Sequence, residues 1–417
     1  MKFYGLALQS RLTSWAILAS LLALAACDDN HHHYACINCG ATATPYEVSL
    51  GLIAGNFTNN GDTSLIATST ILYNPQVNAG NLKTYLSSGP GAFAAPVLIA
   101  DGDDPLYLAT ADLNGDKLPD VVSASYSDGT LSVFFNSAQS PGTFSTPLVL
   151  SSPGASQVAI ADMNGDGLPD IVSADFNVSL FLQTSPGAFA SPVSLYSGGA
   201  NWVAVGDLNG DGAPDVALTD NVGVKILLHT GAASATTFAA PVTVFTQTVN
   251  ANAVGANLIA IADVNGDGLN DLVITDPGPT GGAAPTVSVL LQDPANHGQF
   301  LAAVSYPIAP GSVPTSIIVT DVNGDNHPDI VIGGSTAVSV LLQVAATPGT
   351  FAAATNYAVT NANQIAIADV NGDGHLDIVV GTGVTHTLQS GVVSNNPGVL
   401  LQSAASPGTF GSLQDLP

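Results

Sequence analysis

The stretch Asp162-Met163-Asn164-Gly165-Asp166-Gly167-Leu168-Pro169-Asp170 decides the fold, because it recurs along the chain in almost unchanged form. The pattern Asp-x-Asn-Gly-Asp-x-x-x-Asp begins at Asp112, Asp162, Asp207, Asp263, Asp321 and Asp369. Successive copies are separated by 50, 45, 56, 58 and 48 residues. Self-similarity at such a period indicates one repeat array rather than a set of unrelated domains.

A second phrase, usually Gly-x-Phe, follows each copy of the first. It begins at Gly91, Gly142, Gly187, Gly298, Gly349 and Gly408, and one unit has Phe238-Ala239-Ala240-Pro241 in its place. A weakened copy of the aspartate loop, Asn56-Phe57-Thr58-Asn59-Asn60-Gly61-Asp62, lies upstream of the others. With this copy included, both phrases occur seven times, which predicts seven units.

Each unit is expected to form four short β-strands. In the third unit we expect strands at 157–161, 170–174, 178–183 and 189–196, where Val, Ile, Leu and Phe are bounded by turn-forming residues. Four strands in roughly 40 to 50 residues are typical of a propeller blade, whereas parallel β-helices have shorter repeats. The prediction is therefore an all-β fold: a seven-bladed β-propeller of four-stranded blades over residues 46–417.

The aspartate loop offers the ligands that calcium prefers. Side-chain oxygens stand at positions 1, 3, 5 and 9, position 7 can add a backbone carbonyl, and calcium takes six to eight oxygen ligands. Glycines such as Gly165 and Gly167 permit the left-handed backbone of a tightly wound loop. The chain's 31 acidic residues include a single glutamate, Glu47, so the shorter acid is preferred. We predict about six structural calcium ions, one in each intact loop. The predicted ligands are Asp112, Asn114, Asp116, Asp120, Asp162, Asn164, Asp166, Asp170, Asp207, Asn209, Asp211, Asp215, Asp263, Asn265, Asp267, Asp271, Asp321, Asn323, Asp325, Asp329, Asp369, Asn371, Asp373 and Asp377.

The alternative to calcium binding is that the loops are ordinary hairpin turns, since Asn-Gly and Asp-Gly are also common in hairpin turns. Six clusters of three carboxylates would then repel without a cation, and they hold 18 of the 31 acidic residues. Two copies depart from the pattern at position 6, with Lys117 and Asn326 in place of glycine, and Lys117 is expected to weaken its site. In the weakened first copy we expect one inserted residue, Leu65 in place of the last aspartate, and no bound metal.

The paired phrases resemble the FG-GAP and VCBS repeats that build the seven-bladed propeller of integrin α subunits and of many bacterial surface proteins. The resemblance covers nearly all of the chain after Pro45, and the aspartate loops are its specific feature. It implies calcium between the first two strands of a blade, and adhesion or ligand binding elsewhere. The family also includes lectins and domains attached to lyases and phospholipases, so the fold alone does not define the function.

The N-terminal residues 1–26 predict a bacterial lipoprotein signal peptide. Lys2 and Arg11 precede an apolar run at 15–26 that is too short to span a bilayer. The stretch Leu24-Ala25-Ala26-Cys27 resembles a lipobox, which implies that Cys27 is lipidated and becomes the mature N-terminus. Residues 27–45 are then a flexible tether at the cell envelope, in the periplasm or on the outer membrane surface.

One cluster in the tether has two open interpretations. It could bind zinc or copper, or it could belong to a tether with one local disulfide or idle thiols. The cluster contains His31, His32, His33, Cys36 and Cys39.

Charge and motifs exclude several functions. The net charge is −26, and after the signal peptide only Lys83, Lys117 and Lys225 are basic, which excludes nucleic acid and anionic lipid headgroups as partners. The chain has no G-x-S-x-G and no H-E-x-x-H motif. We therefore predict a monomeric, non-catalytic binding or adhesion module for a glycan or a protein ligand. The alternative is an accessory or catalytic domain of a carbohydrate-active enzyme, resembling a polysaccharide-lyase propeller, with Lys225 and a neighbouring tyrosine as base.

The longest predicted connections locate the ligand surface. Antiparallel strands a to d place the a–b and c–d turns on one side of a blade, and the b–c and d–a connections on the other. The extra length falls in b–c and d–a connections, so binding is expected opposite the aspartate loops. The predicted ligand contacts are Tyr73, Asn78, Asn250, Asn252, Thr280 and His386.

Overall fold

The structure, a computed structural model, describes residues 46–48, 51–72, 80–102, 104–220, 222–231, 236–246, 258–278, 284–382, 386–387, 393–394 and 397–416. The predicted signal peptide, Cys27 and the tether lie outside these residues. Within the described part of the chain, every regular element is a β-strand, and no segment forms a helix long and apolar enough to cross a membrane.

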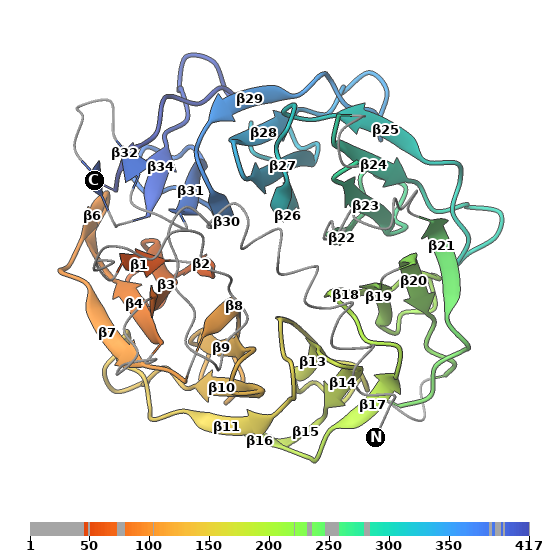
Figure 1. The fold of residues 1–417 in the computed structure, drawn as a ribbon, viewed down its shortest axis with the longest axis horizontal. Coiled ribbons are helices and arrows are strands. Elements are labelled where there is room, and N and C mark those ends of the chain that lie inside the picture. Colours follow the sequence, from red (N-terminus) through yellow and green to blue (C-terminus); the bar gives the residue numbers. More distant parts are fainter. Residues whose placement is uncertain are drawn as a thin grey trace, which may run out of the picture.

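Seven antiparallel sheets stand around a central axis (Figure 1), which confirms the predicted all-β, seven-bladed propeller. Blade 1 contains β2 (Leu52–Gly55), β3 (Ser64–Leu72), β4 (Asn81–Tyr85) and β7 (Val97–Ala100), and β1 (Tyr46–Val48) also pairs with β3. Blade 2 contains β8 (Pro105–Ala111), β9 (Asp120–Ser125), β10 (Thr130–Phe134) and β11 (Leu148–Ser151). Blade 3 contains β12 (Gln157–Ala161), β13 (Asp170–Ala174), β14 (Val178–Phe181) and β17 (Val193–Tyr196). Blade 4 contains β18 (Trp202–Gly206), β19 (Asp215–Thr219), β20 (Gly223–Leu227) and β21 (Val242–Thr246).

The remaining blades repeat this order of strands a, b, c and d from the axis outward. Blade 5 contains β22 (Ile259–Ala262), β23 (Asp271–Asp276), β24 (Thr286–Leu290) and β25 (Val304–Pro307). Blade 6 contains β26 (Pro314–Thr320), β27 (Asp329–Gly334), β28 (Ala337–Leu341) and β29 (Thr355–Ala358). Blade 7 contains β30 (Ala362–Ala368), β31 (Asp377–Thr382), β34 (Gly398–Leu400) and β35 (Gln414–Asp415). Two short hairpins, β5 (Ser87–Gly89) with β6 (Ala92–Phe93) and β15 (Gln183–Ser185) with β16 (Ala188–Phe189), lie in c–d turns.

The third blade shows where the predicted strands were right and where they were wrong. Strands a and b begin and end at the predicted residues, 157–161 and 170–174. Strand c ends at Phe181, and strand d begins only at Val193. Between them Gln183 pairs with Phe189, so the Gly-x-Phe phrase forms a small c–d hairpin and does not start strand d.

The core is a ring of seven apolar clusters, each between two neighbouring blades. Strand b supplies much of it, because in blades 2 to 4 every residue of this strand is buried. The cluster that closes the ring joins Leu65 and Tyr85 of blade 1 to Val379 and Val399 of blade 7. Each blade buries both faces against its neighbours, so the ring closes by side-chain packing between two complete blades.

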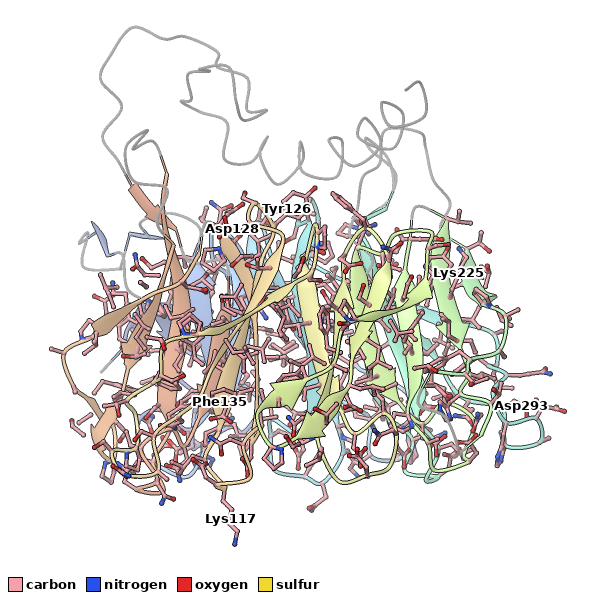
Figure 2. All side chains as sticks on the ribbon, turned by 90° about the horizontal axis from the view of Figure 1, so that it is seen from below. Lys117, Tyr126, Asp128, Phe135, Lys225 and Asp293 are labelled. Atoms are coloured by element: carbon pink, nitrogen blue, oxygen red, sulfur yellow. The ribbon has the colours of Figure 1, made fainter. Side chains whose placement is uncertain are left out.

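The two sides of the disc carry different connections (Figure 2). Lys117, in an a–b loop, projects from one side, and Tyr126 and Asp128, in a b–c hairpin, lie at the other. We call these sides the loop face and the hairpin face. The arrangement confirms that b–c hairpins lie opposite the aspartate loops.

Two aromatic side chains meet across the central axis. Tyr107 of blade 2 contacts Trp202 of blade 4 edge to face, with ring centroids 5.2 Å apart. The Tyr107 hydroxyl also hydrogen-bonds Gln364 of blade 7 and Gln157 of blade 3, and Trp202 Nε1 donates to the Ile259 carbonyl, 3.1 Å away. Because blade 2 is next to neither blade 4 nor blade 7, the contacts of Tyr107 with Trp202 and Gln364 cross the centre of the ring.

Candidate functional site

All seven a–b loops share one backbone conformation. Positions 4 and 6 have positive φ in every copy, including the weakened one. The residues at these two positions are Asn59, Gly61, Gly115, Lys117, Gly165, Gly167, Gly210, Gly212, Gly266, Gly268, Gly324, Asn326, Gly372 and Gly374. Glycine and asparagine adopt this conformation most readily, whereas Lys117, at φ 71, does so at a steric cost.

The carboxylate of the position-1 aspartate accepts hydrogen bonds from backbone N–H groups of its own loop. In the third blade Asp162 Oδ1 accepts from the Gly165 and Asp166 N–H groups at 2.7 and 3.1 Å, and Oδ2 accepts from Gly167 N–H at 2.8 Å. At positions 3 and 5, Asn164 Oδ1 accepts from Asp166 N–H, and Asp166 Oδ1 accepts from Leu168 N–H. The side chains at positions 1, 3 and 5 therefore turn inward onto the winding of their own loop.

The position-9 aspartate has a different environment. Asp170 is fully buried at the start of strand b, where Oδ2 accepts from Met163 N–H at 2.9 Å and Oδ1 accepts from Gln183 N–H at 2.7 Å. Burial, reinforced by the charges of Asp166 and Asp162, raises the pKa of Asp170 to about 6. The pKa of the equivalent carboxyl is raised in the same way in all six intact loops, namely at Asp120, Asp170, Asp215, Asp271, Asp329 and Asp377.

The donor set of each intact loop fits calcium chemically. Three carboxylates and one amide oxygen are hard oxygen ligands of the kind this cation takes. Among the described residues, however, no three carboxylate, imidazole or thiol groups lie together as a formed metal centre. In this structure the carboxylates accept backbone N–H groups instead, so calcium remains a prediction of the sequence pattern.

The first loop corrects two expectations. Gly55 pairs with Ser64 as Ala111 pairs with Asp120 in blade 2, so the first loop has the usual length and no inserted residue. The residue in place of the last aspartate is Ser64, not Leu65: its Oγ accepts from Ser87 N–H at 2.9 Å, as Asp170 accepts from Gln183. The expectation was wrong because the pairing of β2 with β3 aligns Ser64, and not the next residue Leu65, with position 9 of the other loops.

In blades 2, 3, 6 and 7 a side-chain amide links the loop to the preceding one. Gln183 Nε2 donates to the Leu113 carbonyl in the loop of blade 2 at 3.0 Å, and to the Pro169 carbonyl of its own loop at 3.3 Å. Gln343, Gln402 and Asn136 make the same two kinds of bond in blades 6, 7 and 2. In blade 1 the equivalent residue is Ser87, whose single hydroxyl proton has two local acceptors within reach, Gly89 O and Asp62 Oδ2.

The Gly-x-Phe phrase provides the second link between blades. A Cβ on Gly349 would lie 3.1 Å from Asn265 Cβ, and one on Gly408 would lie 3.2 Å from Asn323 Cβ, in each case at position 3 of the preceding loop. Across the closure of the ring, a Cβ on Gly91 would lie 2.5 Å from the Asn371 carbonyl oxygen of blade 7. In these three units the glycine is thus required by the close approach of the neighbouring loop, whereas a Cβ on Gly187 in blade 3 would lie 3.2 Å from the Phe135 ring.

The predicted ligand contacts fall mainly in connections that the structure does not describe. Five of the six, Tyr73, Asn78, Asn250, Asn252 and Thr280, lie outside the described residues. The sixth, His386, lies in β32 (His386–Thr387), which pairs with β33 (Val393–Ser394) within the b–c connection of blade 7.

The tyrosine next to Lys225 is Tyr196, and both contact Asp220. Lys225 Nζ pairs with Asp220 Oδ2, to which the Tyr196 hydroxyl also donates at 2.9 Å. Burial and the Asp220 carboxylate raise the pKa of Tyr196 to about 12. Burial acts to raise the pKa of Asp220, but the hydrogen bond from Lys225 and those from Val222 N–H and Tyr196 outweigh it and lower the pKa. An ammonium held by a carboxylate and a tyrosine of raised pKa fit a clamp between blades 3 and 4 better than a general base.

Solved structures of similar fold include proteins that bind ligands and partners. One is a lectin from Agrocybe aegerita that recognises non-reducing terminal N-acetylglucosamine, with a TM-score of 0.51, 21% identity, and coverage of 75% of this chain and 80% of the lectin. A second is BBS1N in complex with ARL6DN (TM-score 0.51, 10% identity, coverage 87% and 94%). A third is the V. cholerae biofilm matrix protein Bap1 (TM-score 0.45, 12% identity, coverage 89% and 90%). At these identities the likeness to the lectin and to BBS1N shows the fold alone.

No curated protein matches the chain. The FG-GAP-like repeat matches it five times, at 112–173, 162–218, 207–274, 263–332 and 321–380, each match running from one aspartate loop into the strand after the next. Together these matches cover more than half of the sequence, and they coincide with the loops and strands of blades 2 to 7. The chain therefore belongs to the FG-GAP-like repeat family.

Proposed function

We propose that the protein is a calcium-stabilised, non-catalytic binding module that is lipid-anchored at the bacterial cell envelope and recognises a glycan or a protein ligand. The observation that carries this proposal is the FG-GAP-like propeller itself, whose aspartate loops and the amides that link them all lie at the loop face. This division leaves the hairpin face for a ligand. The lectin of similar fold supports a saccharide as one class of ligand.

Calcium is proposed for the six intact loops, and the first loop supplies an internal control. Positions 1, 5 and 9 are aspartates in the six loops but Asn56, Asn60 and Ser64 in the first. A cation that binds only the folded state stabilises it by mass action. Metal analysis of the purified domain should find about six calcium ions per chain, and EDTA should lower the melting temperature. Fewer than about three ions per chain would contradict the proposal.

The anchor is proposed from Cys27 and the residues before it. The Cys27→Ser variant should accumulate as an unprocessed precursor, while the wild type should partition with membranes. A variant processed and distributed like the wild type would disprove the lipid anchor without affecting the binding proposal.

The ligand surface is proposed to be the hairpin face. A glycan array and a pull-down from envelope extract should each be run on the mature domain, with calcium and with EDTA. Shortening the b–c connections of blades 5 and 7 should weaken binding of a ligand that extends over these connections, and it should leave the calcium content intact. If binding survives this shortening, those two connections are not the ligand surface.

A further inference from the structure

We infer that a glycan ring stacks on an aromatic pair at the seam between blades 2 and 3 on the hairpin face. The pair, which we call the seam aromatics, consists of Tyr126 and Phe176. This inference rests on the proposed binding function and assigns it a ligand class and a place. Neither residue lies in the long connections from which the ligand surface was predicted.

The seam aromatics come from the b–c hairpin tips of two neighbouring blades. Their ring centroids are 6.5 Å apart and their planes are nearly perpendicular, at 84°. Phe176 remains 44% exposed although it touches Tyr126, and on the next hairpin tip Val222 is 52% exposed. Hairpin tips normally carry small polar turn residues. Large apolar side chains on three successive tips therefore point to a surface used for contact.

The Phe176 ring is held in place from below. A Cβ on Gly154 would lie 2.8 Å from the ring, so the ring rests directly on the backbone of the turn between blades 2 and 3. Phe176 N–H also donates to the Pro153 carbonyl, 3.3 Å away. A ring supported on one side by backbone and on one edge by Tyr126 offers its remaining surface in a fixed orientation.

The hairpin that carries Phe176 is itself rigid. Asp175, only 1% exposed, accepts from Asn177 N–H at 2.6 Å through Oδ1 and from the Ser152 hydroxyl at 2.9 Å through Oδ2. Its own N–H donates to the Asn177 carbonyl. A binding group fixed before the ligand arrives loses little conformational entropy on binding.

The chemistry and size of the site favour a neutral glycan. The apolar C–H face of a pyranose ring packs on an aromatic ring, while its hydroxyl groups need short polar partners nearby. Ser127 and Asp128 follow Tyr126 on the same tip, and Figure 2 places Asp128 beside Tyr126 at the hairpin face. An anionic glycan is disfavoured, because Asp104 accepts a hydrogen bond from Ser127 and a second carboxylate lies at this tip.

A protein partner would need a larger surface. Stable protein interfaces bury about 800 Å² on each side. Two aromatic rings and one valine cover far less than this area, which matches one or two sugar rings. The alternative of a protein ligand is therefore an outcome of the test and not part of the inference.

The test uses the calcium-loaded mature domain on an array of neutral oligosaccharides, with affinities for each positive glycan measured by titration. Phe176→Ala and Tyr126→Ala should each weaken binding about tenfold or more, and Phe176→Tyr should retain it. Val149→Ala is the matched control, because Val149 is 57% exposed on the outer strand of blade 2, away from the hairpin tips. Melting curves should show that both alanine variants remain folded, and having two variants guards against a folding defect in one.

The outcomes separate the inference from the proposed function. Glycan binding by the wild type that both alanine variants retain would overturn the inference and leave the proposed function standing. Loss of binding in Val149→Ala to the same degree would also overturn it, since the effect would not be local. If the wild type binds no glycan and instead captures a protein, the inference fails while a binding module remains.

Discussion

The aspartates of each loop divide into two groups by what their oxygens accept. Those at positions 1 and 5 accept N–H groups of the exposed winding of the loop, where water can replace any lost bond. The one at position 9 lies in the interior and accepts two N–H groups that have no access to water, one of them at the end of strand c. Position 9 therefore joins strands in addition to its predicted role as a calcium ligand, whereas positions 1 and 5 hold only the winding of their own loop.

A pair of substitutions should separate these roles. Asp170→Asn places an amide N–H against a buried backbone donor, which should lower the free energy of unfolding by about 1–3 kcal/mol with or without calcium. Asp166→Asn keeps an oxygen for Leu168 N–H, so it should matter only when calcium is present, and calcium content should fall by one ion. Urea denaturation in calcium and in EDTA measures both effects. Equal destabilisation by the two variants in EDTA would contradict this division.

At the scale of elements, the loops and c–d turns lie together on the loop face. In blades 2, 3, 6 and 7 the side-chain amide that follows strand c reaches the loop of the preceding blade. These four blades are thus joined to the preceding blade by polar contacts at the loop face as well as by the apolar cluster between the sheets. In blades 1, 6 and 7 the aspartate loop and the Gly-x-Phe phrase supply the two sides of a further contact between blades.

Removing one link should weaken one joint. Gln183→Met keeps the volume but deletes the bonds to the Leu113 and Pro169 carbonyls, one buried and one partly buried, at a cost of about 1–2 kcal/mol in the free energy of unfolding. The control is Thr184→Val, which deletes an exposed hydroxyl bond to the Ala188 carbonyl and should cost less than about 0.5 kcal/mol. Urea denaturation compares the two. A cost for Gln183→Met no larger than that of the control would contradict the link.

At the scale of the molecule, the ring must close between its first and last blades. The first blade lacks both the position-9 aspartate and the strand-c glutamine, having Ser64 and Ser87 instead. Closure then depends on the apolar cluster between blades 7 and 1 and on the contact of Gly91 with Asn371. The edge-to-face contact of Tyr107 with Trp202 joins blades 2 and 4 across the axis and does not depend on the seam between blades 7 and 1.

Gly91→Ala tests the closure. Its Cβ would lie 2.5 Å from the Asn371 carbonyl oxygen, a contact that backbone movement must relieve. Gly311→Ala is the matched control, because Gly311 has a similar φ of +72 and nothing within 4 Å of the added carbon. The control should cost about 1–2 kcal/mol of unfolding free energy from its backbone conformation alone, and Gly91→Ala about 1–3 kcal/mol more. Equal melting temperatures for the two variants would show that the seam does not depend on this contact.

The stability of the whole domain should depend on pH in a way that calcium reverses. The pKa of five position-9 carboxyls is raised from 3.8 to about 6, so between these values the folded state binds more protons than the unfolded state. Their stabilising contribution is complete below pH 3.8 and is lost as the pH rises through about 6.

In EDTA the melting temperature should therefore fall between pH 4 and pH 7. Calcium competes with these protons, so the gain in melting temperature on adding calcium should be small near pH 4 and complete above about pH 6. Scanning fluorimetry in both buffers measures the two curves. A melting temperature in EDTA that rises over this range would contradict the assignment.

The repeated phrases determined much of the molecule by themselves: seven units, four strands in each, left-handed positions 4 and 6 in each intact loop, and the side of the disc on which the loops lie. These properties are local, since turn residues and apolar alternation act within one blade. The register of Ser64, the burial of Asp170, the contact of Gly91 with Asn371 and the meeting of Tyr107 with Trp202 were decided only by the tertiary structure. Each of them depends on the alignment of paired strands or on how close distant blades come when seven of them close a ring, and no spacing within a repeat encodes that distance.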